Sequence, residues 1–481
     1  MTRRISSVPP IPLILLILMV TAMTVMAIRP ANAAPIPLDD HSFRSFDGGR
    51  YYYLSTPQVS PLWDVHNITL RFSDRYYYSD DTTLVSNRWL LHFADSINFQ
   101  NIDFNFRIRL DCPGSRVRDA GWTSAVAGDA NDPGFVYDPD RIIAHYTPND
   151  RFRFGFGKDR YNWGQLELGG LLLSDYNEGF TGLYQQYNLG PFVLRGLAAQ
   201  LNSIKTGPAN SAITHRYFSA SRLEYFRPKY GFAVSQSMLY VGVGRSWDIR
   251  YLFPFYIFHY GQMTDSHGYG NDGQNSQGAI DAYFKIPGQP LELYGELLVD
   301  DFQVHSDSQS QSAQNCLAWM AGLRLKDAGK WYGFIEGGRI NTYVYNHRTL
   351  AKQYVYNGNF IGSPLGPDQE LLWGKIGRKF DVYDNTLSAD VNFWRRRSGE
   401  RGIGYRYPNI FGTSGDPVPY GIIEHELSFW ASASYRRHYI DMEVRAGSAM
   451  YRNRGNAVSG WSAYPFAGVF LSSGISVGAS K

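Results

Sequence analysis

Apolar and polar residues alternate strictly along many short stretches of this chain. In residues 102–111 the apolar row is Ile102, Phe104, Phe106, Ile108 and Leu110, and the polar row between them is Asp103, Asn105, Arg107, Arg109 and Asp111. The same alternation recurs in 291–300, 427–436 and 440–447. Successive side chains of a β-strand point to opposite faces of a sheet, so this period of two predicts strands with one apolar face.

Short turns and long polar connections take turns along the chain. The short ones, such as 147–150 and 286–290, are rich in Gly, Pro, Asn and Asp, whereas the long ones include 111–140 and 158–178. A membrane barrel has short turns at one rim and long loops at the other, whereas a soluble β-sandwich has no reason to sort its connections by side. The pattern therefore predicts an all-β fold, a transmembrane outer-membrane β-barrel.

About 18 antiparallel strands are predicted. They are 66–74, 84–97, 99–110, 141–147, 151–157, 179–188, 191–201, 215–226, 230–240, 279–287, 291–301, 316–326, 331–345, 370–382, 386–397, 422–435, 438–452 and 462–473. An even number puts both termini in the periplasm and the long loops outside the cell. Segment 251–260 is apolar without alternation and contains Pro254, which disfavours a central strand. We expect it to belong to a long element folded into or over the barrel.

The first 33 residues predict a secretory signal peptide. Arg3 and Arg4 precede an apolar run over 11–28, and Ala31-Asn32-Ala33 fits the small-x-small cleavage rule. The alternative is an uncleaved membrane anchor. The expected organisation is a signal peptide (1–33), a periplasmic N-terminal segment (34–65) and an outer-membrane β-barrel (66–481).

Composition narrows the class of protein further. No second apolar run reaches transmembrane-helix length, and a mean hydropathy of −0.32 excludes a helical membrane bundle. Aromatic residues make up 16% of the chain, which suits the aromatic girdles of a barrel but also a carbohydrate-binding protein. The formal charge of +3 comes from the three arginines of residues 1–33, and the other 43 basic residues balance 43 acidic ones. The charge therefore does not indicate a nucleic-acid partner.

The sequence does not contain a recognisable catalytic motif. Gly157-Lys158 lacks the spacing of a phosphate-binding loop, because Phe152 and Asp159 occupy the positions that need Gly and Ser or Thr. The adjacent carboxylates of Asp300 and Asp301 face opposite sides of a strand and cannot act as an acid–base pair. A hydrolase or acyltransferase would need a nucleophile, a base and an orienting group, which the sequence does not bring together. We expect no enzymatic activity, no cofactor and no metal site.

The two cysteines, Cys112 and Cys316, are too few for a disulfide scaffold. The order of short and long connections places both on the extracellular side. A disulfide needs Cα atoms within about 7 Å, so the sequence leaves open whether they pair.

Three blocks of sequence carry a resemblance to known proteins. They are Gly157-x-Asp159-x-x-x-Trp163-Gly164 with the following 171–175, then 221–242 leading to 251–255, and 291–302. These blocks resemble the family of capsule-assembly outer-membrane proteins typified by Wzi. The resemblance covers about 150–302 well and the carboxy-terminal barrel by pattern only, and 34–100 does not clearly match. It implies an 18-stranded outer-membrane barrel and a lectin-like role in holding capsular polysaccharide at the cell surface.

Aromatic residues and carboxylates in two long connections are candidates for binding a polysaccharide. An aromatic ring stacks on the apolar face of a sugar and a carboxylate accepts its hydroxyl groups, so Asp159 and Trp163 are expected to line a sugar site. The alternative for Trp163 is packing within the loop. Tyr354 and Tyr356, in the connection 346–369, are further candidates. The charged residues expected to line the lumen are Asp103, Arg107, Arg109, Glu292, Glu296 and Asp300.

The leading hypothesis is a non-enzymatic, lectin-like protein in the outer membrane of a Gram-negative bacterium. It would retain capsular or other exopolysaccharide, with that polymer, outer-membrane lipid and the barrel assembly machinery as its partners. The alternative is a porin or substrate-specific channel, because eighteen strands enclose a lumen wide enough for water unless something fills it. We expect folded-in loops to fill the lumen partly. The charged rows would tune selectivity in a porin and would pair with the plug in a filled barrel.

Overall fold

The computed structural model describes residues 65–479 with several gaps. The gaps are 80–85, 100, 114–135, 177–178, 207–211, 260, 262–273, 302–315, 326–327, 383–384, 403–404, 406–416 and 438–439. The predicted signal peptide and the N-terminal segment up to residue 64 lie outside the described residues.

The described part of the chain is built almost entirely of strands. They are β1 (Val65–Ser79), β2 (Ser86–Phe99), β3 (Ile102–Pro113), β4 (Val136–Asn149), β5 (Phe152–Asp159), β6 (Phe180–Leu189), β7 (Phe192–Gln200), β8 (Ile204–Thr206), β9 (Ala212–Phe226), β10 (Tyr230–Val243), β11 (Gln274–Lys285), β12 (Leu291–Asp301), β13 (Cys316–Leu325), β14 (Trp331–Ile340), β15 (Val355–Tyr356), β16 (Asn359–Phe360), β17 (Gln369–Val382), β18 (Asn385–Ser398), β19 (Glu424–Arg437), β20 (Ile440–Arg452) and β21 (Ser462–Ala479). The helical elements are α2 (Ile249–Leu252), η4 (Leu350–Lys352) and η5 (Arg454–Asn456). Within the described residues, no helix has both the length and the apolar character needed to cross a bilayer.

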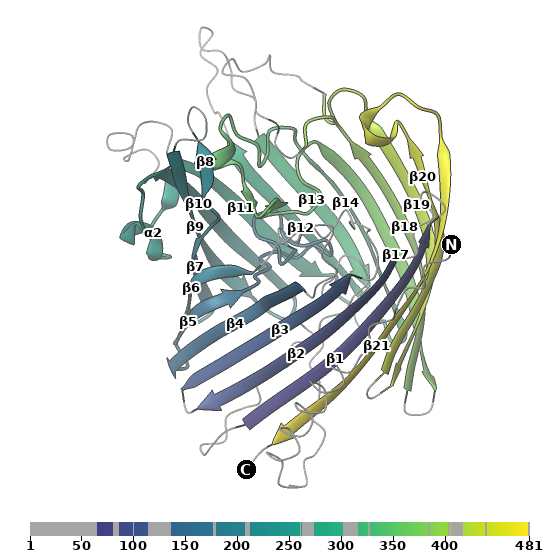
Figure 1. The fold of residues 1–481 in the computed structure, drawn as a ribbon, viewed down its shortest axis with the longest axis horizontal. Helices are drawn as coiled ribbons and strands as arrows, with labels where there is room; N and C mark the ends of the chain where they lie inside the picture. The colour runs from purple at the N-terminus through teal and green to yellow at the C-terminus, as the bar shows by residue number, and fades with distance from the viewer. Residues whose placement is uncertain are drawn as a thin grey trace, which may run out of the picture.

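The strands form a ring of antiparallel ladders that closes on itself. The first strand, β1, pairs with β2 on one side and with the last strand, β21, on the other. β7 pairs directly with β9, so the three-residue β8 only extends one end of β9, and β15 and β16 form a separate small hairpin. The described residues therefore build a closed barrel of 18 strands plus β8 (Figure 1), which confirms the predicted fold class and strand number.

The barrel wall exposes apolar side chains on one face and buries polar ones on the other. On β18, Val391 is 58% exposed, while its neighbours Asp390 and Asn392 are 7% and 3% exposed. On β12, Leu293 and Leu297 are exposed and alternate with buried acidic residues. This inverts the pattern of a soluble protein, and it is the arrangement expected when the outer face meets lipid and the inner face meets a polar lumen.

The connections are sorted between the two rims, as the sequence predicts. Those joining β2 to β3, β4 to β5, β6 to β7, β9 to β10, β11 to β12, β13 to β14, β17 to β18 and β19 to β20 have two to five residues. The connections at the opposite rim have six to 30 residues. We call these the short-turn rim and the long-loop rim (Figure 1).

One strand, β14, is shorter than the sequence predicted. β14 ends at Ile340, whereas the strand was expected to reach residue 345. Beyond Ile340, Asn341 N still donates to Leu317 O of β13 at 3.1 Å, and the chain then turns, so that Tyr345 N donates to the Asp300 carboxylate of β12 at 2.9 Å.

Cys112 and Cys316 both lie at the long-loop rim. Cys112 is near the end of β3 and Cys316 is the first residue of β13. The path from β3 to β13 crosses nine ladders in an 18-strand ring, so the two strands lie on opposite sides of the barrel. Because a disulfide spans only about 7 Å between Cα atoms, we expect no bond between these cysteines.

Candidate functional site

The connection between β5 and β6 folds inward and occupies the lumen. Its backbone doubles back between Trp163 and Leu173, where Trp163 N donates to Leu173 O at 2.9 Å. The run Leu171-Leu172-Leu173 is buried, as is Leu166. We call residues 160–176 the plug loop.

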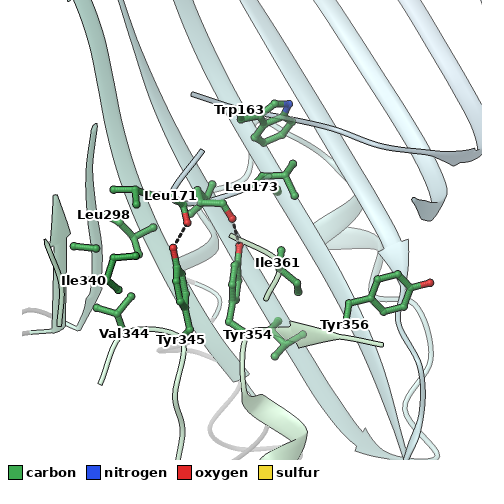
Figure 2. Packing of buried hydrophobic residues seen from close by; sticks show 14 of the residues in the cluster. Trp163, Leu171, Leu173, Leu298, Ile340, Val344, Tyr345, Tyr354, Tyr356 and Ile361 are labelled. Carbon is green, nitrogen blue, oxygen red and sulfur yellow. Dashed lines mark hydrogen bonds between the residues drawn. The ribbon is translucent and has the colours of Figure 1, made fainter. Parts of the chain in front are cut away.

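A second long connection interlocks with the plug loop. We call residues 341–368, between β14 and β17, the companion loop. Tyr345 Oη donates to Leu171 O at 2.5 Å and Tyr354 Oη donates to Leu172 O at 2.9 Å (Figure 2). Burial raises the pKa of both tyrosines, so both phenols remain protonated donors at neutral pH. The two loops therefore form one packed unit.

Carboxylates of the inner wall hold the plug loop in place. Glu296 on β12 accepts hydrogen bonds from the backbone N–H groups of Gln165 at 2.5 Å, Leu171 at 2.8 Å and Leu166 at 3.3 Å. Glu336 on β14 accepts from Glu167 N at 2.8 Å. Buried backbone groups need partners, and the plug loop has little ladder of its own to supply them. The wall acids provide those partners.

Two glycines of the plug loop allow the backbone to approach its neighbours closely. A Cβ on Gly164 would lie 1.8 Å from Oε1 of Glu296, and a Cβ on Gly170 would lie 2.1 Å from the carbonyl oxygen of Trp163. Any larger residue would push the loop off the wall or open its turn. The Trp163-Gly164 pair and the double glycine Gly169-Gly170 are therefore structural features of the docked loop.

The four residues predicted to bind polysaccharide are all buried. Asp159, Trp163, Tyr354 and Tyr356 are 5%, 5%, 0% and 8% exposed. Asp159 pairs with Arg141 at 2.8 Å, and the ring of Tyr356 stacks on Phe180 at 5.4 Å between centroids. In this arrangement Asp159 joins two strands of the wall, and the three aromatic residues pack within the core formed by the loops and the wall. A sugar would reach them only after the loops separate, so their sugar-binding role stays a prediction.

The charged residues predicted to line the lumen lie along β3 and β12. Those with described side chains are Asp103, Arg107, Glu292, Glu296 and Asp300, and the side chain of Arg109 lies outside the described part. Asp103 is 3.6 Å from Arg153, and Glu292 is 3.7 Å from Arg324. Asp300 and Glu296 contact the two loops directly. These charges thus pair within the wall or anchor loop backbone.

Glu336, Arg324 and Asp281 also hold the plug loop, and they were not predicted from the sequence. Arg324 donates to Gln165 O, and the Gln165 side chain donates to Asp281 at 3.4 Å. Arg222 fixes Asp281 through two bonds of 2.5 and 2.8 Å. The available signal was a lone carboxylate, Glu336, within the otherwise uncharged first eight residues of the predicted strand 331–345. Among the residues that the structure describes, no group of three or more His, Cys, Asp or Glu side chains could hold a metal ion.

A partly exposed group of aromatic rings surrounds Arg401, in the connection from β18 to β19. Its guanidinium carbon is 3.3 Å from the Tyr420 ring centroid, 5.1 Å from that of Tyr405 and 5.5 Å from that of Tyr343. Arg401 also donates to Tyr343 Oη at 2.8 Å. Rings and a cation at the long-loop rim offer both stacking and hydrogen bonding to a sugar.

Comparison with known proteins connects this architecture to one family. The model of the family described as capsule assembly protein Wzi matches residues 150–454. No curated protein sequence matches the chain. Among solved structures, Escherichia coli Wzi, described as an outer membrane protein involved in group 1 capsule assembly and a carbohydrate-binding β-barrel, has a TM-score of 0.55 at 15% identity over 83% of each chain. OccD3 (OpdP) and OprD of Pseudomonas aeruginosa have TM-scores of 0.47 and 0.46 at 9% and 10% identity, over 86% of this chain and 91% and 95% of theirs.

The likeness to Escherichia coli Wzi concerns the fold alone, whereas the family match spans more than half of the chain and includes the plug and companion loops. This chain therefore belongs to the capsule assembly protein Wzi family and is an outer-membrane β-barrel.

Proposed function

We propose that this protein binds capsular or other extracellular polysaccharide and holds it on the cell surface as a lectin, without catalysing a reaction. The observation that carries the proposal is the family match over residues 150–454, together with a lumen that contains two loops anchored to the wall. A filled lumen suits a surface receptor better than a passage. Escherichia coli Wzi, which has a similar fold, is described as carbohydrate-binding.

The proposal includes an orientation and a set of partners. The long-loop rim faces the outside of the cell and both termini lie in the periplasm, after removal of residues 1–33. The lipid of the outer membrane surrounds the barrel, and the barrel assembly machinery inserts it. Residues 34–65 are a periplasmic segment.

The rings around Arg401 are the proposed contact with the polymer. Each sugar repeat would make weak stacking and hydrogen-bond contacts, and such contacts add up along a repeating polymer through effective concentration. Many copies of a weak lectin can therefore retain a coat. Trp163, Tyr354 and Tyr356 would contribute by holding the loops that support this rim, or by contacting sugar directly when the loops part.

A deletion strain tests the proposal directly. We expect total polymer to stay constant while polymer moves from the cell surface to the medium. A variant with Arg401→Gln and Tyr420→Ala should reproduce part of this release. The matched control is Trp331→Ala, which removes a ring that is 49% exposed at the short-turn rim. Unchanged surface polymer in the deletion strain would contradict the lectin function, and altered polymer length without release would indicate catalysis instead.

A channel is the second candidate function. The observation in its favour is the charged inner wall of a wide ring, for example Arg396 with Glu424 at 2.9 Å and Glu426 at 3.0 Å. Planar-bilayer recording separates the two candidates. Steady conductance by the purified protein, together with unchanged surface polymer in the deletion strain, would favour the channel.

A further inference from the structure

The apolar segment that follows β10 crosses the outer face of the barrel. We call residues 247–258, which include α2, the outer strap. It lies outside the wall beside β9 and β10 (Figure 1). It follows a single row of cross-strand neighbours, in which Gln185 on β6 pairs with Gly196 on β7, Gly196 with Ser221 on β9, and Ser221 with Gln236 on β10.

This row gives the backbone of the outer strap its hydrogen-bond partners. Gln185 Nε2 donates to Leu252 O at 2.6 Å and Gln236 Nε2 donates to Tyr256 O at 2.7 Å. Phe258 N in turn donates to Gln236 Oε1 at 2.9 Å. Irregular backbone is tolerated at membrane depth only where protein groups satisfy it. The outward-facing amides of the wall do this for three backbone groups of the outer strap, and Tyr251 N and Tyr256 N bond to Asp248 O and Phe253 O within the strap.

Tight packing fixes the outer strap against the wall. A Cβ on Gly196 would lie 2.9 Å from Cβ of Pro254. The wall therefore has a residue without a side chain at the point where the proline packs. Tyr251 and Phe258 are almost fully buried and pack with aromatic and Met side chains of β9 and β10. The ring of Tyr251 lies 4.9 Å from that of Tyr240 between centroids. The outer strap is therefore a fixed layer of the wall.

The face of the outer strap that points away from the wall is mainly apolar. Its one charged pair is Arg250, whose side chain is 40% exposed, with Asp248 at 2.6 Å. Its exposed large side chains are Trp247, Ile249, Phe253, Phe255 and Ile257, each 39% to 67% exposed. Below the row, the wall exposes Leu223, Phe232 and Val234, and Ile280 on β11 pairs with Val234. The apolar surface of the outer strap is thus continuous with the lipid-facing surface of the strands.

The position of the row along the strands agrees with this continuity. Gln236 lies six residues after the start of β10 at the short-turn rim. Six residues span about 20 Å along a strand, or roughly 15 Å of height at a tilt of about 40°. The apolar band of an outer-membrane barrel is about 25 Å tall, so the row falls within it.

We propose that the outer strap is immersed in the membrane and that its exposed face contacts lipid acyl chains. The strap is a permanent part of the lipid-facing surface, and it covers a polar row of the wall that lipid could not solvate. This inference is independent of polysaccharide binding. It assigns a role to a segment that the lectin function does not use.

Spin-label accessibility tests the proposal on the full-length protein. In a background with Cys112→Ser and Cys316→Ser, a nitroxide is attached at Phe255→Cys or Ile257→Cys, and the protein is placed in phosphatidylcholine vesicles. Oxygen, which concentrates in lipid, and a nickel chelate, which stays in water, are used as relaxing agents. Val234→Cys is the lipid-facing control, and Val458→Cys, at a side chain 83% exposed in the connection from β20 to β21, is the water-facing control.

We expect the labels at 255 and 257 to behave like the label at 234, with an oxygen-to-nickel accessibility ratio several-fold above that at 458. A ratio like that at 458 would place the outer strap in water and overturn the proposal. Low accessibility to both agents would also overturn it, because the face would then be covered by protein, such as a second copy of the chain. Heat-dependent gel mobility of each variant shows that the barrel is folded.

Discussion

Replacing Glu296 by Gln is expected to loosen the plug loop while leaving the barrel intact. Its carboxylate accepts three backbone N–H groups, those of Gln165, Leu166 and Leu171. The amide keeps one acceptor oxygen but turns an N–H₂ donor towards backbone donors, and it removes the charge. Hydrogen bonds to a charged group contribute about 1.5–3 kcal/mol each. We expect a loss of about 3 kcal/mol in loop docking, which raises the undocked population by roughly two orders of magnitude.

Gly164→Ala should have a similar effect from the loop side, because its Cβ would lie 1.8 Å from the same carboxylate oxygen. Both substitutions disrupt the same contact between Glu296 and the plug loop. The double variant should therefore lose less docking free energy than the sum of the two single variants. The matched control is Glu443→Gln, which makes the same chemical change on the inner wall of β20, where Glu443 pairs with Arg445 at 3.0 Å.

Two measurements report on the undocked population. Single-channel recording in planar bilayers should show more frequent openings, and trypsin should cleave faster after Arg160 in the plug loop, since cleavage follows the open population when closing is fast. Heat-dependent gel mobility should not change, because the strand ladders are untouched. If Glu296→Gln and Gly164→Ala match Glu443→Gln in both measurements, the wall acids do not anchor the loop and the reasoning is refuted.

Four further outcomes are expected. Tyr354→Phe removes the hydroxyl group that bonds Leu172 O and Ser237 Oγ, at a cost of about 1–3 kcal/mol in loop docking, and faster trypsin cleavage than in Tyr420→Phe would show it. Burial, with the charges of Lys352 and Arg348, lowers the pKa of His347 from 6.5 to about 3. Between these two pH values His347 is protonated in the undocked loop and neutral in the docked loop. Docking should therefore weaken as pH falls from 6.5 towards 3, and His347→Gln should reduce this dependence, which conductance recorded against pH would reveal. Gel mobility should be the same with and without reductant, because Cys112 and Cys316 lie on opposite sides of the ring; a shift would show a bond. The unboiled protein should migrate differently from the boiled protein, since a closed barrel resists detergent, and identical mobilities would contradict closure.

The strands could be predicted from the sequence because their two faces meet different solvents. Every ring strand was found, but some ends were not. β11 begins at Gln274, whereas the predicted strand began at residue 279. The prediction missed this start because Gln274, Asn275 and Gln277 are polar, like the residues of a loop, although they are buried. Asn275 pairs with Leu239 and its side chain donates to Lys352 O at 3.1 Å, a partner that no local pattern reveals.

The candidate site was harder to predict than the fold. Trp163 and Tyr354 were selected because aromatic rings bind sugars, but the same rings pack loops, and only the fold shows which surface each ring meets. Segment 251–260 was expected to fold into or over the barrel, and its residues 251–258 lie on the outer wall. Its apolar composition fits both places. The feature that distinguishes the two places is Gln236, a polar residue within the outward-facing apolar row of β10. Its side-chain amide bonds the outer strap, whereas alternation alone shows only an interruption of the row.

The attachment of the plug loop to distant strands imposes an order on the assembly of the barrel. The loop leaves the wall after β5, but its partners follow much later in the chain: 125 residues separate Leu171 from Glu296, 169 separate Glu167 from Glu336, and 182 separate Leu172 from Tyr354. Contacts of such long sequence separation form late in folding. The growing barrel is therefore hollow until β12, β14 and the companion loop are in place. The plug and companion loops can fill the lumen only when the wall is nearly complete. A chain stalled before that stage would leave a water-filled pore in the membrane.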